Sequence, residues 1–244
     1  MNAARGEPVE PRAGVATEVC RMRGLFITGT DTGVGKTEVT CALVANARAA
    51  GLDAVPMKPA QSGVAPGEPT DADRLHAACD GAEPLEVLCP YSFAAPLAPA
   101  VAARLEGRQV SFGAIVDGVR ALAARHEAVL VEGAGGLLVP LTEEETYADL
   151  AVALGLSVLV VARAGLGTVN HTALTVEALR ARGLVLTAIV LNQACETDDP
   201  SVPYNPAEIA RVTGREPLAR LAHVRDIAER QRFLRSRLAG KIQF

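Results

Sequence analysis

The stretch Gly29–Thr37, which reads Gly-Thr-Asp-Thr-Gly-Val-Gly-Lys-Thr, restricts the fold of this chain more than any other segment. It follows the apolar run Gly24–Ile27 and leads into Glu38–Ala47, whose composition predicts a helix. A strand, a glycine-rich turn and a helix that opens with Gly-Lys-Thr place backbone N–H groups around an anion. This order predicts an α/β fold with a phosphate-binding loop.

Two side chains of this loop carry specific roles. Lys36 is positioned to reach the β- and γ-phosphates of a nucleotide, and the Thr37 hydroxyl is a candidate Mg²⁺ ligand. The usual motif has a glycine five residues before the glycine of Gly-Lys-Thr, where this chain has Thr30 and where Gly29 stands one residue earlier. The loop is therefore a variant. A glycine-rich turn that binds no ligand is the alternative interpretation.

Length and composition narrow the class of protein. The 244 residues suffice for one large domain with a full core. The 24 Lys and Arg against 28 Asp and Glu give a net charge of −4 without a basic run, which argues against a nucleic-acid partner. Tryptophan is absent and the apolar residues are mainly aliphatic, which suits buried parallel strands covered by helices. No apolar run approaches the roughly 18 residues that a membrane span needs.

The cysteines and the first residues bear on compartment and domain organisation. The 5 cysteines are scattered without a Cys-x-x-Cys pair, which predicts a reducing compartment, the cytoplasm, and no zinc site. Residues 1–22 contain Pro, Glu and Arg but lack the apolar segment of a secretory signal. We interpret residues 1–22 as a disordered extension, with Met22 as an alternative start, and residues 23–244 as one domain.

Apolar runs alternate with helical patterns along most of the chain, which predicts βαβ units. The expected architecture is a three-layer sandwich like that of P-loop nucleoside triphosphatases, with a mainly parallel sheet between helices. The predicted strands are Leu25–Thr28, Ala54–Lys58, Ala128–Glu132, Ser157–Ala162, Thr187–Asn192 and Leu218–His223. The predicted helices are Lys36–Ala50, Ala72–Cys79, Ala98–Glu106, Phe112–Arg125, Tyr147–Leu154, Val169–Ala181, Pro206–Thr213 and Val224–Ala239.

Polar residues just after the strands are the first candidates for a site, because ligands bind at the carboxyl ends of the strands in open α/β sheets. Lys58 ends the second strand, where a lysine can neutralise a transferring phosphoryl group or hold an anionic substrate. A solvated lysine is the alternative. Ser62 and Gly63 follow Pro59 in a close-packed loop, which favours a functional role for this segment.

Acidic residues at two further positions are candidate metal ligands. Glu132 ends an apolar strand and precedes the glycine-rich segment Gly133–Gly136, at the place where nucleoside triphosphatases hold their metal, generally with Asp. Asp71 and Asp73 both open a helical stretch, so either can be an N-cap. Either can instead be a carboxylate ligand of Mg²⁺. The spacing leaves this choice open.

Two more segments follow later strands. The turn Gly165–Gly167 leads into a helix and predicts a second anion-binding N-terminus, although an ordinary turn capped by Thr168 explains the same residues. His171 in this segment is interpreted as structural or exposed. Asn192 closes the fifth strand, where its amide can hydrogen-bond the edge of a nucleobase.

Taken together, these segments resemble the dethiobiotin synthetases, ATP-dependent enzymes late in biotin synthesis. The displaced Gly29 is that family's own form of the loop. The resemblance covers most of the chain, in the family's order. It rests on the segments Gly29–Thr37, Lys58–Gly63, Val131–Gly136, Gly165–His171 and Leu191–Asn192.

The resemblance implies a reaction in which 7,8-diaminopelargonate, CO₂ and MgATP give dethiobiotin, ADP and phosphate. One substrate amine captures CO₂ as a carbamate, which attacks the γ-phosphate to form a carbamic–phosphoric anhydride. The second amine then closes the ureido ring. The resemblance also implies a homodimer with active sites near the interface, Mg²⁺ as cofactor and ATP as co-substrate.

The resemblance also assigns residues to roles. The nucleotide-binding residues are Thr32, Gly33, Val34, Gly35, Lys36, Thr37, Glu132 and Asn192. The catalytic residues are Lys58, Lys36, Thr32 and Ser62. The metal ligands are Thr37, Asp73 and Glu132, with Asp73 preferred to Asp71 because Asp73–Leu75 matches the family's Asp-x-Leu. The substrate-binding residues are Thr32, Lys58 and Ser62 and, from the partner subunit, Gly165, Leu166, Gly167, Thr168 and Asn170.

One segment departs from the family, and two alternative functions remain. Pro217–His223 lacks the family's Gly-x-x-Pro loop near the base, so the base contacts and nucleotide selectivity stay open. A partitioning ATPase that acts by ATP-dependent dimerisation is the first alternative. Such proteins often have a lysine where this chain has Asp31 and Thr32, and an aspartate in place of Glu132. An amide-forming synthetase is the second, although it normally needs a glutaminase module.

Overall fold

A parallel sheet organises the molecule. The computed structural model describes residues 22–196 and 198–242, so the predicted extension, residues 1–22, lies outside this part except for Met22. The main sheet has 6 strands in the order β2-β5-β1-β6-β7-β8, and every pairing in it is parallel. Its strands are β1 (Gly24–Gly29), β2 (Ala54–Met57), β5 (Ala128–Gly136), β6 (Ser157–Arg163), β7 (Leu186–Asn192) and β8 (Ala219–Leu221).

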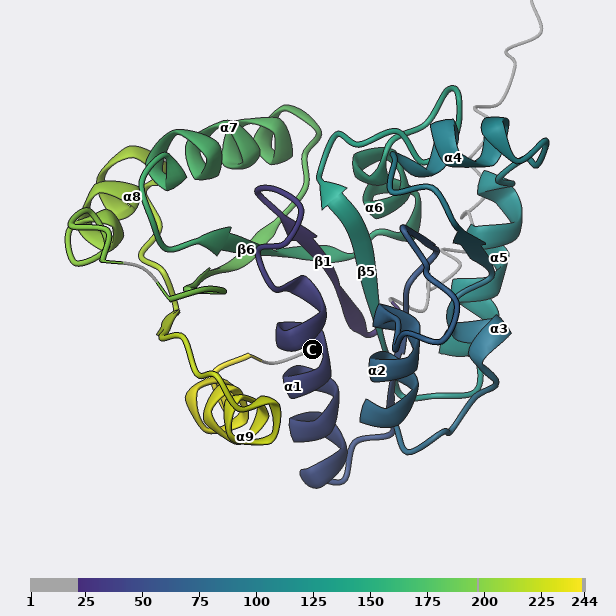
Figure 1. Ribbon diagram of the computed structural model, residues 1–244, viewed down its shortest axis with the longest axis horizontal. Helices are drawn as coiled ribbons and strands as arrows, with labels where there is room; N and C mark the ends of the chain where they lie inside the picture. The colour runs from purple at the N-terminus through teal and green to yellow at the C-terminus, as the bar shows by residue number, and fades with distance from the viewer. Residues whose placement is uncertain (1–21, 197, 243–244) are drawn as a thin grey trace, which may run out of the picture.

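Helices cover both faces of this sheet. They are α1 (Lys36–Ala49), α2 (Asp71–Ala78), α3 (Leu85–Leu88), α4 (Pro99–Leu105), α5 (Phe112–Ala123), α6 (Tyr147–Leu154), α7 (Thr168–Ala181), α8 (Asn205–Thr213) and α9 (Ile227–Leu238). On one face α1 lies between α2 and α9 and contacts both, while α6, α7 and α8 lie on the other face (Figure 1). The predicted three-layer α/β sandwich is confirmed.

The core lies on both sides of the central strands. Most residues of β1, β5 and β6 are buried, as expected for parallel strands covered by helices on both faces. Large aliphatic groups fill it, together with Phe26 and Tyr147, whose rings lie 6.5 Å apart. In the described part of the chain, no helix combines the length and apolar character that crossing a membrane requires.

The six predicted strands and eight predicted helices are present, with small differences at their ends. Three short elements were not predicted: β3 (Ala60–Ser62), β4 (Tyr91–Phe93) and α3. β3 and β4 form a separate parallel pair. Each has only 3 residues, so neither shows a periodic pattern, and their pairing depends on a distant segment.

β5 is longer than predicted. The predicted end of this strand at Glu132 is wrong, because β5 continues to Gly136. Ile27 pairs with Glu132 whereas Gly29 pairs with Gly136, so β5 accommodates extra residues in a bulge. Glu132 therefore lies within β5 rather than at its end.

The pairing of β1 with β5 can be tested at Gly24, because a Cβ atom there would lie 2.0 Å from the carbonyl oxygen of Val129. We expect Gly24→Ala to lower the free energy of unfolding by about 2–4 kcal/mol, since backbone rather than a side chain must move. Gly113→Ala in α5 is the matched control, because its Cβ atom would meet nothing within 4 Å. Chemical denaturation measures both; equal stability of the two variants would contradict this register.

Candidate functional site

The phosphate loop joins β1 to α1. α1 begins at Lys36, and its N-cap Gly35 has φ 93°, in the left-handed region. A Cβ atom on Gly35 would lie 2.1 Å from Nδ2 of Asn192. That Nδ2 donates to the carbonyl oxygen of Val34 at 2.9 Å. Position 35 therefore requires glycine both for its backbone conformation and for the close approach of β7.

Lys36 folds back against the loop. Its Nζ donates to the carbonyl oxygen of Asp31 at 3.0 Å, and the residue is 7% exposed. Burial lowers the pKa of Lys36 to about 8, although nearby Glu132 acts in the opposite direction. A buried ammonium group with so little water around it is stabilised by an anionic ligand. The loop thus offers an anion both backbone N–H groups and a desolvated positive charge.

Lys58 is the centre of a second group of side chains, directly after β2. Its Nζ donates to Oε1 of Glu132 and to Oδ2 of Asp71, each at 2.7 Å. The Thr37 hydroxyl donates to the same Oε1 at 2.7 Å. The side chains of Lys58 and Glu132 are 4% and 0% exposed. We call Thr37, Lys58, Asp71 and Glu132 the Lys58 cluster; it joins residues at or next to α1, β2, α2 and β5.

The electrostatics of the cluster keep its charges in place. Burial by itself would lower the pKa of Lys58, but the carboxylates of Glu132 and Asp71 raise it above its ordinary value. Burial would also raise the pKa of Asp71, but Lys58 holds it below its ordinary value. Lys58 therefore stays an ammonium ion and Asp71 a carboxylate at neutral pH.

Glu132 carries an unsatisfied group. Its Oε2 atom is buried and has no hydrogen-bond partner within the described residues. A buried carboxylate oxygen without a partner is costly, so this position suits a cation. Together with the Thr37 hydroxyl and the Asp71 carboxylate, it forms a set of oxygen donors of the kind that Mg²⁺ prefers alongside phosphate oxygens. The donor set therefore fits Mg²⁺.

Asp73 is the predicted metal ligand, but it lies outside this cluster, and Asp71 is the carboxylate beside Lys58. Its Oδ2 accepts hydrogen bonds from the backbone N–H and the hydroxyl of Thr70, both at 2.7 Å. The Thr70 hydroxyl in turn accepts from the Asp73 backbone N–H, which completes a capping box at the start of α2. Residues two apart point in different directions on a helix. Asp71 therefore faces Lys58 and Asp73 faces solvent.

A cleft of about 960 Å³ connects the phosphate loop with the Lys58 cluster. Val34 does not line the cleft, and its carbonyl oxygen accepts a hydrogen bond from Nδ2 of Asn192. Glu132 is fully buried, and its Oε1 is bonded to Lys58 and Thr37. The predicted site residues that line the cleft are Thr32, Gly33, Gly35, Lys36, Thr37, Lys58, Ser62 and Asn192.

The turn before α7 does not line this cleft in the single chain. Gly165 and Leu166 border a second cavity of about 330 Å³. The Leu166 N–H donates to Oδ2 of Asp199 at 2.6 Å. The N-cap of α7 is Gly167, so Thr168 is the first residue of the helix and not its cap. Contact of this turn with a substrate therefore requires a second subunit and stays a prediction.

Sequence reasoning gave no role to several side chains that line the cleft, among them Gln61, Arg74 and Arg230. Gln61 ties β3 to α2, because its Oε1 accepts from the Ala72 N–H at 3.2 Å. Arg74 follows Asp71 by three residues, a spacing that puts both on one face of α2 and was a usable signal. For Arg230 there was no signal, because α9 is far from the loop in sequence.

Known proteins resemble this chain strongly. A family profile described as "AAA domain" matches residues 23–231. Two proteins named ATP-dependent dethiobiotin synthetase BioD, from Anaeromyxobacter sp. (strain K) and Anaeromyxobacter dehalogenans (strain 2CP-1), are each 73% identical over 223 residues, covering 91% of this chain and 100% of theirs. The chain belongs to the dethiobiotin synthetase family. A synthetase of the same name from Caulobacter vibrioides (strain NA1000) is 43% identical, covering 73% of this chain and 83% of its own.

Solved structures with other names share the fold of this chain. A ParA family ATPase from Chlorobium tepidum has a TM-score of 0.53 at 14% identity, covering 89% of this chain and 92% of its own. A MinC:MinD complex chain from Aquifex aeolicus has a TM-score of 0.53 at 13% identity, covering 88% and 86%. These similarities show a shared fold only. The high identity to synthetases decides against the partitioning-ATPase alternative.

Asp71 and Asp73 make a matched pair of test positions. We expect Asp71→Asn to lower kcat/KM for ATP by about 100-fold, because Lys58 loses an ion-pair partner and the cleft loses a carboxylate. Asp73→Asn should cost about 1 kcal/mol of stability through the lost cap, with kcat/KM unchanged. Steady-state kinetics and thermal unfolding of both variants measure this. The opposite ranking in kcat/KM would restore Asp73 as the functional carboxylate.

Proposed function

We propose that this chain closes the ureido ring of dethiobiotin from 7,8-diaminopelargonate and CO₂, with ATP converted to ADP and phosphate. The observation that supports this most directly is Lys58, a buried ammonium group in the same cleft as the phosphate loop. Phosphoryl transfer to a substrate oxygen requires positioning and positive charge rather than a nucleophilic side chain. The cleft supplies these features.

The two lysines define how ATP lies. Gly33, Gly35 and Lys36 bind the triphosphate through backbone N–H groups and the ammonium group. The γ-phosphate points toward Lys58, because Thr37 links the loop to the Lys58 cluster through Glu132. Lys58 then stabilises the carbamate and the negative charge on the transferring phosphoryl group.

Thr37, Asp71 and Glu132 are the residues that would hold Mg²⁺. When bound there, the ion would supply positive charge that helps to neutralise the phosphate oxygens. Asp71 also keeps Lys58 charged, since its carboxylate raises the pKa of that lysine. The chain thus provides both the oxygen donors and the ammonium group that a phosphoryl transfer to carbamate needs.

The substrate carries its own nucleophiles, so the bonds change among substrate atoms. One amine forms a C–N bond to CO₂ and releases a proton, giving a carbamate. A carbamate oxygen bonds to the γ-phosphorus as the bond to ADP breaks. The second amine then attacks the carbonyl carbon, loses a proton and expels phosphate. Thr32 and Ser62 line the cleft and hold the substrate near Lys58.

A homodimer completes the substrate site in this proposal. The turn Gly165–Thr168 and Asn170 do not line the cleft of their own chain. Nearby apolar side chains are exposed, among them Leu166 at 77% and Leu174 at 56%. An exposed apolar surface next to a helix N-terminus suits a symmetric contact that presents this N-terminus to the partner's substrate carboxylate.

The function predicts a strict coupling of ATP use to both other substrates. We expect ADP release to require the diamine together with bicarbonate or CO₂, because the γ-phosphate has no acceptor until a carbamate forms. A coupled ADP assay with each substrate omitted in turn, and mass spectrometry of the product, measure this. Rapid ADP release without the diamine would contradict the proposal.

The shared site can be tested by mixing one inactive variant with one that uses the diamine poorly. Lys58→Ala should abolish turnover but keep ADP binding, and Asn170→Ala should weaken use of the diamine. If each site takes Lys58 from one subunit and Asn170 from the other, mixed dimers restore about a quarter of wild-type activity, since half the dimers gain one intact site. Activity of refolded or co-expressed mixtures measures this. Absence of any recovery would contradict a shared site.

A further inference from the structure

The nucleoside end of the cleft lies opposite the Lys58 cluster. If the γ-phosphate points toward Lys58, the base and ribose must extend from the phosphate loop toward the ends of β7 and β8. The residues that line the cleft there are Asn192, Gln193, Ala194, Ala222 and Arg230. Asn192 has already committed its Nδ2 to the Val34 carbonyl oxygen, which leaves its side-chain oxygen as an acceptor.

Arg230 differs from the other cations that line the cleft. Lys36 is bonded to Asp31, Lys58 to two carboxylates, and Arg74 to Glu38 at 3.0 Å. Arg230 donates through Nε to the carbonyl oxygen of Val224 at 2.7 Å. Its two terminal nitrogens have no hydrogen-bond or ion-pair partner within the described residues. The guanidinium group is thus held in place through Nε, and its terminal N–H groups are available to a ligand.

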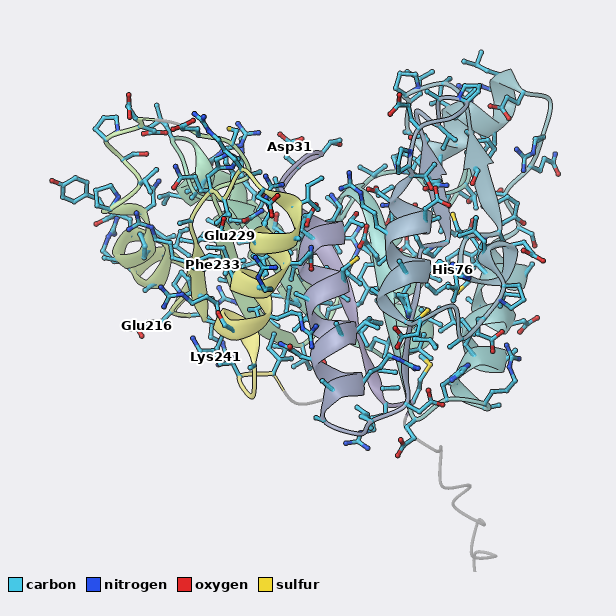
Figure 2. All side chains as sticks on the ribbon, turned by 60° about the horizontal axis from the view of Figure 1, so that its bottom comes forward. Asp31, His76, Glu216, Glu229, Phe233 and Lys241 are labelled. Carbon is cyan, nitrogen blue, oxygen red and sulfur yellow. The ribbon has the colours of Figure 1, made fainter. Side chains whose placement is uncertain are left out.

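α9 holds Arg230 in a fixed place. Asp226 caps this helix by accepting the Glu229 N–H at 2.7 Å, and Gln231 donates to the carboxylate of Glu38 in α1. In Figure 2, Glu229 of α9 lies nearer than Phe233 to Asp31 of the phosphate loop. Arg230 itself lines the cleft, and the packing of α9 on α1 fixes the helix that carries it.

We propose that Arg230 recognises the nucleoside part of ATP, with its planar guanidinium group stacked on the base and its terminal N–H groups available to ring or ribose acceptors. This inference rests on the proposed function, because it takes ATP as the ligand of the cleft. Arginine suits such a role, because its flat, delocalised cation stacks on aromatic rings and an ammonium group does not. Pro217–His223 contributes only Ala222 to the cleft, so the cation comes from the following helix.

The test compares ADP binding, measured by calorimetry with Mg²⁺ on the full chain, among Arg230→Ala, Arg230→Lys and a control. Arg232→Ala is the matched control, because Arg232 is an exposed arginine of α9 that does not line the cleft. We expect Arg230→Ala to raise the Kd for ADP about tenfold and Arg230→Lys to raise it nearly as much, since lysine keeps the charge but lacks the plane. Arg232→Ala should leave the Kd unchanged.

Inorganic tripolyphosphate and adenosine separate the two ends of the ligand. Arg230→Ala should bind tripolyphosphate as the wild type does, which also shows that the cleft is folded, and should lose affinity for adenosine. Unchanged ADP affinity in Arg230→Ala, full rescue by Arg230→Lys, or an equal loss for tripolyphosphate would overturn the inference. Failure of the wild-type chain to bind ADP would instead overturn the proposed function.

Discussion

The buried ion pair between Lys58 and Glu132 is the interaction on which the rest of the site depends. Both side chains are withdrawn from water, with exposures of 4% and 0%, and such a pair is stable only when further hydrogen bonds satisfy it. Thr37 and Asp71 supply those bonds from α1 and α2. The ion pair therefore connects the end of β2 with β5, and Thr37 extends this connection to α1 directly after the phosphate loop.

Strand order makes this meeting possible. β5 lies between β2 and β1 in the sheet, so Glu132 sits between the ends that carry Lys58 and the phosphate loop. Parallel strands bring their carboxyl ends to one edge, where helix N-termini also point. Beyond Glu132, the bulge in β5 brings Ala134 and Gly135 to the lining of the cleft. β5 therefore forms part of the cleft wall at the carboxyl-end edge of the sheet.

The sequence predicted the elements of this fold well and its side-chain partners less well. Apolar runs such as Ser157–Ala162 mark buried parallel strands because the burial of both faces leaves little choice of residue. β3 and β4 show no such apolar run, because each is short and is stabilised by pairing with the other, which lies far away in the sequence. Asp71 and Asp73 looked alike because both lie in the first turn of a helix. Only the Thr70 capping box and the position of Lys58 distinguish them.

The sequence by itself determined the phosphate loop, the parallel α/β architecture and, through resemblance in several segments, the synthetase family. These are properties of local segments, because turn geometry and hydrophobic burial act on neighbouring residues. The tertiary structure alone decided which carboxylate meets Lys58, where β5 ends, and that α9 brings Arg230 to the nucleotide cleft. Those contacts join residues far apart in the chain, and their strength depends on burial and orientation that only the packed sheet and helices create.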